Sequence, residues 1–288
     1  MKRIFFLILL LLPELPAMSQ YDRIDSLLLD VFGNDKTFNR LFDIPSAGNY
    51  LFSGINYNSK TFFAGREIGD NMFSMDGNLY LFHSSGFYAG VSGSWYSESG
   101  QANNFTIITG GIRKPLNRKK TLNIRTSYSR YIFSSPDSVS ENVSRNCLGA
   151  GLSLSNSRVG GSLSFNAFPG KDFSMSLSPA VFSNITIINF RKTGKIMLSP
   201  EVSLFIGSEI ILIPDSGNLS DPSATNYTIA RKYGLLNTMA TLPVNVYAGN
   251  FSFGLGYSVN FPLTQDKTIS YPVNSFFAIS VAYLVSFY

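Results

Sequence analysis

The sequence of 288 residues contains little charge, one cysteine and one histidine. Charged residues make up 14% of the chain, whereas soluble domains carry roughly 25%. The single Cys147 excludes an internal disulfide, and His83 is the only position for a histidine-based metal site or a Ser-His-Asp triad. A P-loop, a GxSxG elbow and a dinucleotide-binding glycine pattern are also absent from the sequence. We therefore expect no enzyme activity, no cofactor and no metal site.

Long hydrophobic runs are absent after the first residues of the chain. No later run approaches the roughly 20 apolar residues that a transmembrane helix needs. The run Ile4–Leu12 follows two basic residues and precedes the small residues Ala17 and Ser19. This arrangement predicts a secretory signal peptide over residues 1–19, so we expect the protein to leave the cytoplasm.

The sequence does contain long segments in which apolar and small or polar residues alternate. Successive side chains of a strand point to opposite faces, so each such segment predicts a strand with one apolar face. In the last segment Leu284 breaks the alternation, because it falls among small residues. The apolar parity there is Phe277, Ile279, Val281, Tyr283, Val285 and Phe287.

A β-sandwich shows the same alternation, but the long segments, the low charge and the signal peptide favour a membrane barrel. We predict an all-β fold: a closed antiparallel transmembrane β-barrel of about twelve strands over residues 49–288, in the cell outer membrane. With the first strand running outward, the longest connections, 134–143, 213–234 and 262–274, all lie outside the cell, as the long loops of such barrels do. The predicted strands are 50–66, 72–83, 87–98, 104–113, 121–133, 144–155, 158–168, 172–190, 195–212, 235–247, 250–261 and 275–287.

The segment 20–48 before the first strand has a different period. Apolar residues recur at helical spacing from Ile24 to Phe32, and Asn34 and Asp35 are candidate caps for a second short helix. We expect one or two amphipathic helices on the periplasmic side. Three placements stay open for them: in the lumen, on the inner leaflet, or against a partner.

Two stretches carry a family resemblance. Residues 62–69, FFAGREIG, and residues 85–99, SGFYAGVSGSWYSES, together with the alternating last strand, resemble an uncharacterised outer-membrane β-barrel family of Bacteroidota-type bacteria. The resemblance implies the barrel fold over most of the chain and the location in the outer membrane. It implies no activity.

His83 and Ser85 have the spacing of the histidine and serine of outer-membrane phospholipase barrels, which they resemble. Two features oppose a catalytic role. His83 shares the outward parity of Leu79 and Leu81, and it lies beside a predicted periplasmic turn, whereas the phospholipase site lies toward the outer leaflet. We expect a histidine of the turn and membrane interface.

The inward parity carries charged residues that are candidates for lining a pore. If the lumen holds water, they would set its ion preference; if they pair with one another, they brace a closed lumen. The lead function is therefore a pore or transporter for small solutes, and the alternative is a non-conducting structural or interaction barrel acting through its outer loops or N-terminal helices. The candidates are Lys60, Arg66, Asp76, Arg125, Arg158, Glu201 and Glu209.

Three kinds of partner can be addressed from the sequence. The formal net charge of +5 is small for this length and gives no reason to expect nucleic acid. The last strand, which stops at the aromatic Phe287, resembles the strand by which the barrel assembly machinery recognises its substrates. Predicted periplasmic turns carry basic residues that would be attracted to anionic outer-membrane lipids; the simpler interpretation is that they are solvated turn residues, and no specific lipid site is predicted. These are Arg113, Lys114, Arg118, Lys119, Lys120, Arg191, Lys192 and Lys195.

Overall fold

The computed structural model describes residues 48–67, 72–97, 105–133, 145–155, 158–170, 173–190, 194–214, 227–265 and 269–287. The predicted signal peptide and the predicted N-terminal helices lie outside these residues. Within the described ranges, no helix is both long enough and apolar enough to cross a membrane.

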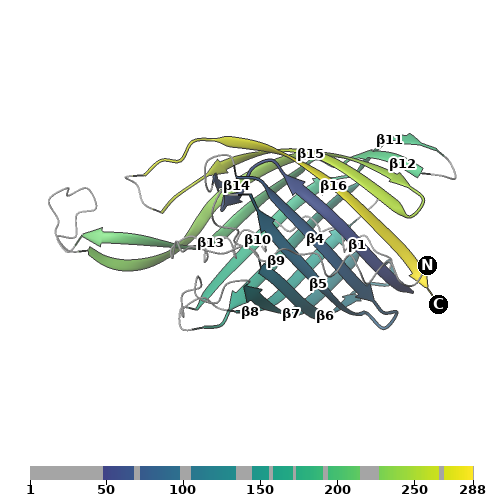
Figure 1. The fold of residues 1–288 in the computed structure, drawn as a ribbon, viewed down its shortest axis with the longest axis horizontal. Coiled ribbons are helices and arrows are strands. Elements are labelled where there is room, and N and C mark those ends of the chain that lie inside the picture. Colours follow the sequence, from purple (N-terminus) through teal and green to yellow (C-terminus); the bar gives the residue numbers. More distant parts are fainter. Residues whose placement is uncertain are drawn as a thin grey trace.

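The described residues form one closed antiparallel barrel (Figure 1). Sequential neighbours pair around the wall, β16 pairs with β1, and β14 pairs with β15, so the sheet closes on itself. β10 and β11 together act as one transmembrane strand of the wall, and so do β12 and β13. Counted in this way, the wall has the predicted twelve strands. The strands are β1 (Asn49–Asn58), β2 (Phe62–Phe63), β3 (Arg66–Glu67), β4 (Ser74–Phe82), β5 (Phe87–Tyr96), β6 (Phe105–Pro115), β7 (Leu122–Phe133), β8 (Asn146–Ser155), β9 (Val159–Phe168), β10 (Ser174–Ser183), β11 (Ile185–Asn189), β12 (Gly194–Leu198), β13 (Glu201–Pro214), β14 (Tyr227–Ala248), β15 (Phe251–Pro262) and β16 (Asn274–Phe287).

The alternation of the sequence decides which side chains face outward. On β15, Leu255 is 58% exposed, whereas Ser258 and Asn260 on the other parity are buried. β16 behaves as predicted: Val281 is exposed and Ser280 is buried. An outer face of large apolar residues and an inner face of small polar ones is the pattern of a barrel wall in lipid.

Aromatic side chains mark both edges of this apolar outer face. Near the outer ends of their strands, the rings of Phe73 and Trp95 lie 5.3 Å apart between centroids, and Tyr57 contacts Phe73 at 5.5 Å. Near the opposite end, Phe251 and Tyr283 lie 4.7 Å apart. Aromatic girdles at both interfaces are typical of membrane barrels. The protein is an outer-membrane β-barrel.

The two ends of the barrel are told apart by their connections. At the inner end, where Asn49 pairs with Phe287, the turns are short, including 83–86 and 249–250. At the outer end the connections are longer, including 59–73 and 134–145. This distribution agrees with the predicted orientation, in which long loops face the outside of the cell.

Several strand limits differ from the prediction. The first strand ends at Asn58 rather than at residue 66, because the chain turns back at Ala64 and Gly65 and pairs β2 with β3. The predicted strand 195–212 is interrupted before β13, where Pro200 has no N–H to donate to the ladder. The predicted strand 172–190 is interrupted opposite this break, at Asn184.

β13 and β14 extend further at the outer end of the barrel than predicted. Their pairing continues to Pro214 and Tyr227, so the connection predicted at 213–234 shortens to 215–226. The pairing of β13 with β10 ends at Ile206 of β13, and the pairing of β14 with β15 ends at Asn237 of β14. We call the two-stranded extension, residues 207–214 paired with 227–234, the outer ribbon; it projects from the barrel on the left of Figure 1.

Candidate functional site

The lumen is the candidate functional site, and its outer end is closed by an apolar cluster. The cluster draws residues from strands that lie around most of the wall, from β5 to β14, together with Ala64 and Met72 of the first outer connection. A cluster with members on so many strands spans the lumen. Its buried residues are Ala64, Met72, Tyr96, Phe105, Ile107, Tyr131, Cys147, Phe168, Phe205 and Leu236.

A short hairpin enters this outer mouth. Residues 61–67, which we call the mouth hairpin, contain β2, β3 and the turn between them. Thr61 and Phe62 are buried, and the ring of Phe62 lies 4.9 Å from that of Phe276 on the inner face of β16. Asn274 Nδ2 donates to the Gly65 carbonyl oxygen at 2.6 Å. The mouth hairpin is therefore held inside the wall by specific contacts.

The turn of the mouth hairpin contains two residues with positive φ angles. Ala64 has φ 45° and Gly65 has φ 80°, which is the pattern of a two-residue hairpin turn with both central residues left-handed. A Cβ atom on Gly65 would collide with the side chain of Asn237 on β14. Glycine is thus required at this position by conformation and by space.

Below the outer cluster the wall is lined by small polar side chains. Thr109 and Ser129 lie 2.9 Å apart between their oxygens, and Thr241 and Ser258 lie 3.0 Å apart. Each pair joins neighbouring strands, so these hydrogen bonds run along the wall. Other inward hydroxyls, including Ser176 Oγ and Ser178 Oγ, have no hydrogen-bond partner among the described residues. A wall with such polar groups is suited to water and polar solutes if the lumen opens.

The inner end of the lumen carries a second apolar cluster. It consists of Phe52, Tyr80, Phe82, Tyr88 and Ala282, all from the wall strands β1, β4, β5 and β16. Leu284, the residue that breaks the alternation of the last strand, packs against it. The exception in the sequence is therefore an inward apolar side chain of this inner cluster.

Two arginines lie side by side on the inner face near the inner end. Arg113 on β6 is paired directly with Arg125 on β7. Their exposed fractions are 9% and 7%. Arg125 was predicted to line the lumen, whereas Arg113 was predicted to lie on a basic periplasmic turn. That placement is wrong because β6 continues to Pro115 and carries Arg113 within the wall.

The predicted residues near the outer mouth form local contacts. Lys60 Nζ lies 2.8 Å from Glu67 Oε1. Arg66 donates to the Leu263 carbonyl oxygen at 2.8 Å, and its guanidinium lies 4.2 Å from the ring centroid of Tyr271. Lys60 and Arg66 thus belong to the mouth hairpin and its flank rather than to a transmembrane strand.

Asp76 and Glu201 lie in strands of the barrel wall. Asp76, in β4, accepts a hydrogen bond from Ser94 at 2.7 Å. Glu201 is the first residue of β13, on the inward parity, and is half-buried.

Arg158 and Glu209 lie outside the regular wall. Arg158 is exposed, just before β9, and its carbonyl oxygen accepts from the Ser183 hydroxyl at 2.9 Å. The backbone of Glu209 lies opposite that of Lys232 in the strand register of the outer ribbon. The two glutamates therefore do not mark two levels of one wall, because the register of β13 with β10 has ended before Glu209.

His83 and Ser85 do meet, but within one tight turn. His83 Nδ1 lies 2.7 Å from Ser85 Oγ, and the Ser85 backbone N–H donates to the same nitrogen at 3.2 Å. Both residues are exposed at the inner end of the barrel. In the described part of the chain, no group of three His, Cys, Asp or Glu residues is placed to hold a metal ion.

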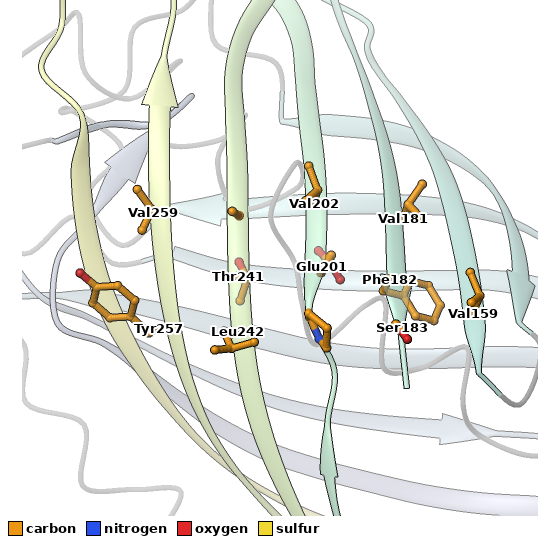
Figure 2. A pocket seen from close by; sticks show the side chains of 12 residues that line it. Val159, Val181, Phe182, Ser183, Glu201, Val202, Thr241, Leu242, Tyr257 and Val259 are labelled. Carbon is orange, nitrogen blue, oxygen red and sulfur yellow. The ribbon is translucent and has the colours of Figure 1, made fainter. Parts of the chain in front are cut away.

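A depression of about 470 Å³ lies in the wall at the break between β12 and β13 (Figure 2). Val181, Val202 and Leu242, which line it, are on the outward parity and exposed. Glu201 and Thr241, on the inward parity, also line it, so the depression draws side chains from both faces of the wall.

Comparisons with known proteins give matches among solved structures alone. No protein-family model matches the chain, and no curated protein matches it. Among solved structures, the chain is similar to the KdgM porin, with 10% identity, a TM-score of 0.45, and 83% of this chain and 99% of that chain covered. It is also similar to the NanC porin, with 7% identity, a TM-score of 0.42, and coverage of 82% and 98%. A third similar structure is LpxR from Salmonella typhimurium, with 7% identity, a TM-score of 0.43, and coverage of 81% and 99%.

The resemblance to the Bacteroidota-type family stays a prediction, since no family model matches. The assignment to outer-membrane β-barrels follows from the closed wall, the apolar outer face and the aromatic girdles described above.

Proposed function

We propose that the protein is a pore for small polar solutes whose outer mouth is closed by the mouth hairpin. The observation that carries the proposal is the composition of the outer closure. Its central part, residues 61–67, is a connection between wall strands and not a part of the wall. Displacing this hairpin leaves every hydrogen-bonded strand pair of the barrel wall intact. The free energy needed to open the pore is therefore small compared with that needed to separate wall strands.

The lumen wall supports the same proposal. Between the two apolar clusters the inward positions are mainly Ser, Thr and Asn, whose oxygens and amides can replace water around a passing solute. Polar interiors occur in water-filled channels and in plugged barrels, so the lining supports the pore together with the mouth hairpin and not alone. We propose no catalytic role, since His83 and Ser85 form only a local turn contact.

The proposal is tested by displacing the mouth hairpin with one substitution. Gly65→Val adds a Cβ at φ 80°, where it would collide with Asn237. Such strain costs about 1–3 kcal/mol, which shifts a two-state equilibrium roughly 5–150-fold toward the open state. We expect a matching rise in the time-averaged conductance of the purified barrel in planar bilayers.

Gly77→Val is the matched control. Gly77 lies in β4, and a Cβ atom added there meets no other atom within 4 Å. The control should conduct like the wild type. Equal conductance of the Gly65→Val variant and the wild type would contradict the role of the mouth hairpin. Absence of current from both variants, even after deletion of residues 20–47, would refute the pore.

The outer ribbon favours a second candidate function. β14 contains 22 residues, far more than the roughly 9–11 that cross a membrane as a tilted strand. Its outer part, paired with β13, presents a long two-stranded surface outside the barrel. A non-conducting barrel that displays this ribbon to an extracellular partner would keep its function without residues 20–47 and lose it when residues 209–232 are replaced by a short turn.

A further inference from the structure

A row of small side chains crosses several neighbouring strands on the lipid-facing side of the barrel. Val181 of β10 lies opposite Val202 of β13, which in turn lies opposite Ala240 of β14. The row continues through direct register partners to Gly161 of β9 and to Val259 of β15. These positions share the outward parity, and Val181 and Val202 are 62% and 52% exposed. We call these five residues the wall groove.

Larger side chains lie on both sides of the wall groove. Two residues further toward the inner end, Leu242 of β14 and Tyr257 of β15 are register partners and are exposed. Two residues further toward the outer end, Leu163 of β9 and Phe261 of β15 are also exposed. Figure 2 shows the valines of the wall groove in one line across the strands, and Leu242 and Tyr257 in the next. This difference in side-chain size produces the depression of about 470 Å³ described above.

The barrel wall is continuous beneath the wall groove. Val181 and Val202 are partners in the ladder between β10 and β13. Glu201 and Thr241, which also line the depression, have the inward parity. Thr241 Oγ1 lies 3.0 Å from Ser258 Oγ on the lumen side. A ligand that approaches from the membrane therefore meets the apolar side chains of the wall groove.

The depression extends from the inner rim of the barrel toward its middle. Val159, which lines it, is the first residue of β9, at the inner end. Tyr257, which also lines it, lies in the middle of β15. The strands of a membrane barrel are tilted, so a line across them changes its depth in the bilayer. An acyl chain of an inner-leaflet lipid extends in the same direction, from the headgroup region toward the bilayer centre.

An exposed arginine adjoins the inner end of the depression. Arg158 precedes Val159, and its carbonyl oxygen accepts hydrogen bonds from Ser183 Oγ at 2.9 Å and from the Asn184 backbone N–H at 2.8 Å. Ser183 itself lines the depression. Arg158 is exposed, and a long basic side chain near a membrane surface keeps its charge in the interface. A guanidinium group in that position matches the oxygens of a phosphate.

We propose that the wall groove and Arg158 form a binding site for a phospholipid of the inner leaflet, with one acyl chain in the groove and the phosphate on the arginine. The site does not depend on the proposed pore, because the wall groove faces lipid whether the lumen is open or closed. It gives Arg158, a predicted pore-lining candidate, a function on the membrane side of the wall.

Native mass spectrometry tests the headgroup contact. The full-length protein in a nonionic detergent is titrated with dioleoyl phosphatidylglycerol, and we expect a single lipid that binds more tightly than the others. Arg158→Gln should weaken its binding about tenfold, since a hydrogen bond from a charged donor contributes roughly that factor. Arg118→Gln is the matched control, because it removes the same charge from an exposed arginine between β6 and β7.

A second substitution tests the wall groove itself. Ala240→Phe places a ring in the row and should weaken binding about tenfold, because the ring excludes roughly two methylene groups of the chain. Ala89→Phe is the matched control, since Ala89 is an exposed outward residue of β5 and does not line the depression. If Ala240→Phe lowers the thermal unfolding midpoint of the lipid-free protein, Val202→Phe, at an exposed position of the same row, replaces it.

The outcomes separate a specific site from the general layer of lipid around the barrel. Weaker binding in Arg158→Gln and in the groove variant, with wild-type binding in both controls, supports the site. Wild-type binding in the groove variant, or equal weakening in variants and controls, overturns it. Weaker binding in the groove variant alone shows a groove for hydrocarbon without phosphate recognition and overturns the assignment to a phospholipid. Binding of glycerophosphoglycerol, which has the headgroup but no chains, would overturn the role of the groove.

Discussion

Both ends of the lumen carry an apolar cluster, but the two clusters are built from different parts of the chain. At the inner end, Phe52, Tyr80, Phe82 and Tyr88 all belong to wall strands. At the outer end, residues of the wall contact the mouth hairpin, which connects β1 to β4. The hairpin of the outer cluster can therefore be displaced without breaking a barrel ladder, whereas the inner cluster can rearrange only by repacking the wall. In the proposed pore, the outer cluster is the movable barrier and the inner cluster is a fixed part of the lumen wall.

The largest effect on stability is expected at the inner cluster. Phe52→Ala should reduce the free energy of unfolding by about 3–5 kcal/mol, because it leaves a cavity among aromatic rings that cannot collapse around it. Urea unfolding in lipid vesicles measures this loss. Ile55→Ala, on the lipid-facing side of the same strand, is the control and should cost clearly less. If both substitutions cost the same, the inner end is not a packed barrier and the comparison fails.

A smaller effect is expected where the mouth hairpin is tied to the wall. Asn274→Ala removes the hydrogen bond to the Gly65 carbonyl oxygen, which contributes about 0.5–1.5 kcal/mol. We expect roughly a twofold to tenfold rise in time-averaged conductance, with Ser275→Ala, one residue along β16, as the control. A rise of the same size in the control would show that the rim as a whole, and not this contact, holds the hairpin.

The smallest effect is expected from the ion pair at the base of the mouth hairpin. Lys60 and Glu67 have side chains that are 32% and 29% exposed, and exposed pairs contribute only about 0–1 kcal/mol. Lys60→Gln should change the conductance less than twofold at 0.15 M salt. A larger change would show that this ion pair helps to hold the mouth hairpin in place. The outer end would then depend on a charged contact, unlike the apolar inner cluster.

Much of the wall could be predicted because the alternation of apolar and polar residues follows directly from the two environments of a strand, lipid on one face and the lumen on the other. Outward residues such as Val281 meet lipid and inward residues such as Ser280 meet the lumen, so hydropathy at a period of two identifies the faces. The same reasoning marked Leu284 as an exception, and the inner cluster explains it.

The mouth hairpin was not predicted because its residues continue the apolar pattern of the first strand. Local hydropathy does not distinguish a strand that faces lipid from a hairpin that faces an apolar cluster, since both environments favour the same side chains. A partial signal was present in Gly65, because glycine suits the second central position of a two-residue turn, whereas Ala64 at φ 45° is not the residue that such turns favour at the first.

Arg113 was missed for a related reason. Its parity agrees with that of Ile107 and Thr109, which are buried inward residues of β6. Grouping it with the neighbouring basic residues of the turn obscured that parity. Glu209 was misplaced because no local pattern states where a strand leaves the barrel and continues as a ribbon.

The pairing of β1 with β16 also constrains the order in which the strands of the barrel can pair during folding. Asn49 of β1 meets Phe287 of β16, although nearly the whole barrel sequence is synthesised between them. One edge of β1 must therefore wait, unpaired, until the end of the chain arrives, and such waiting edges invite aggregation. Contacts between distant parts of a chain form slowly. The first strand of the barrel in the sequence is thus among the last to have both of its edges paired.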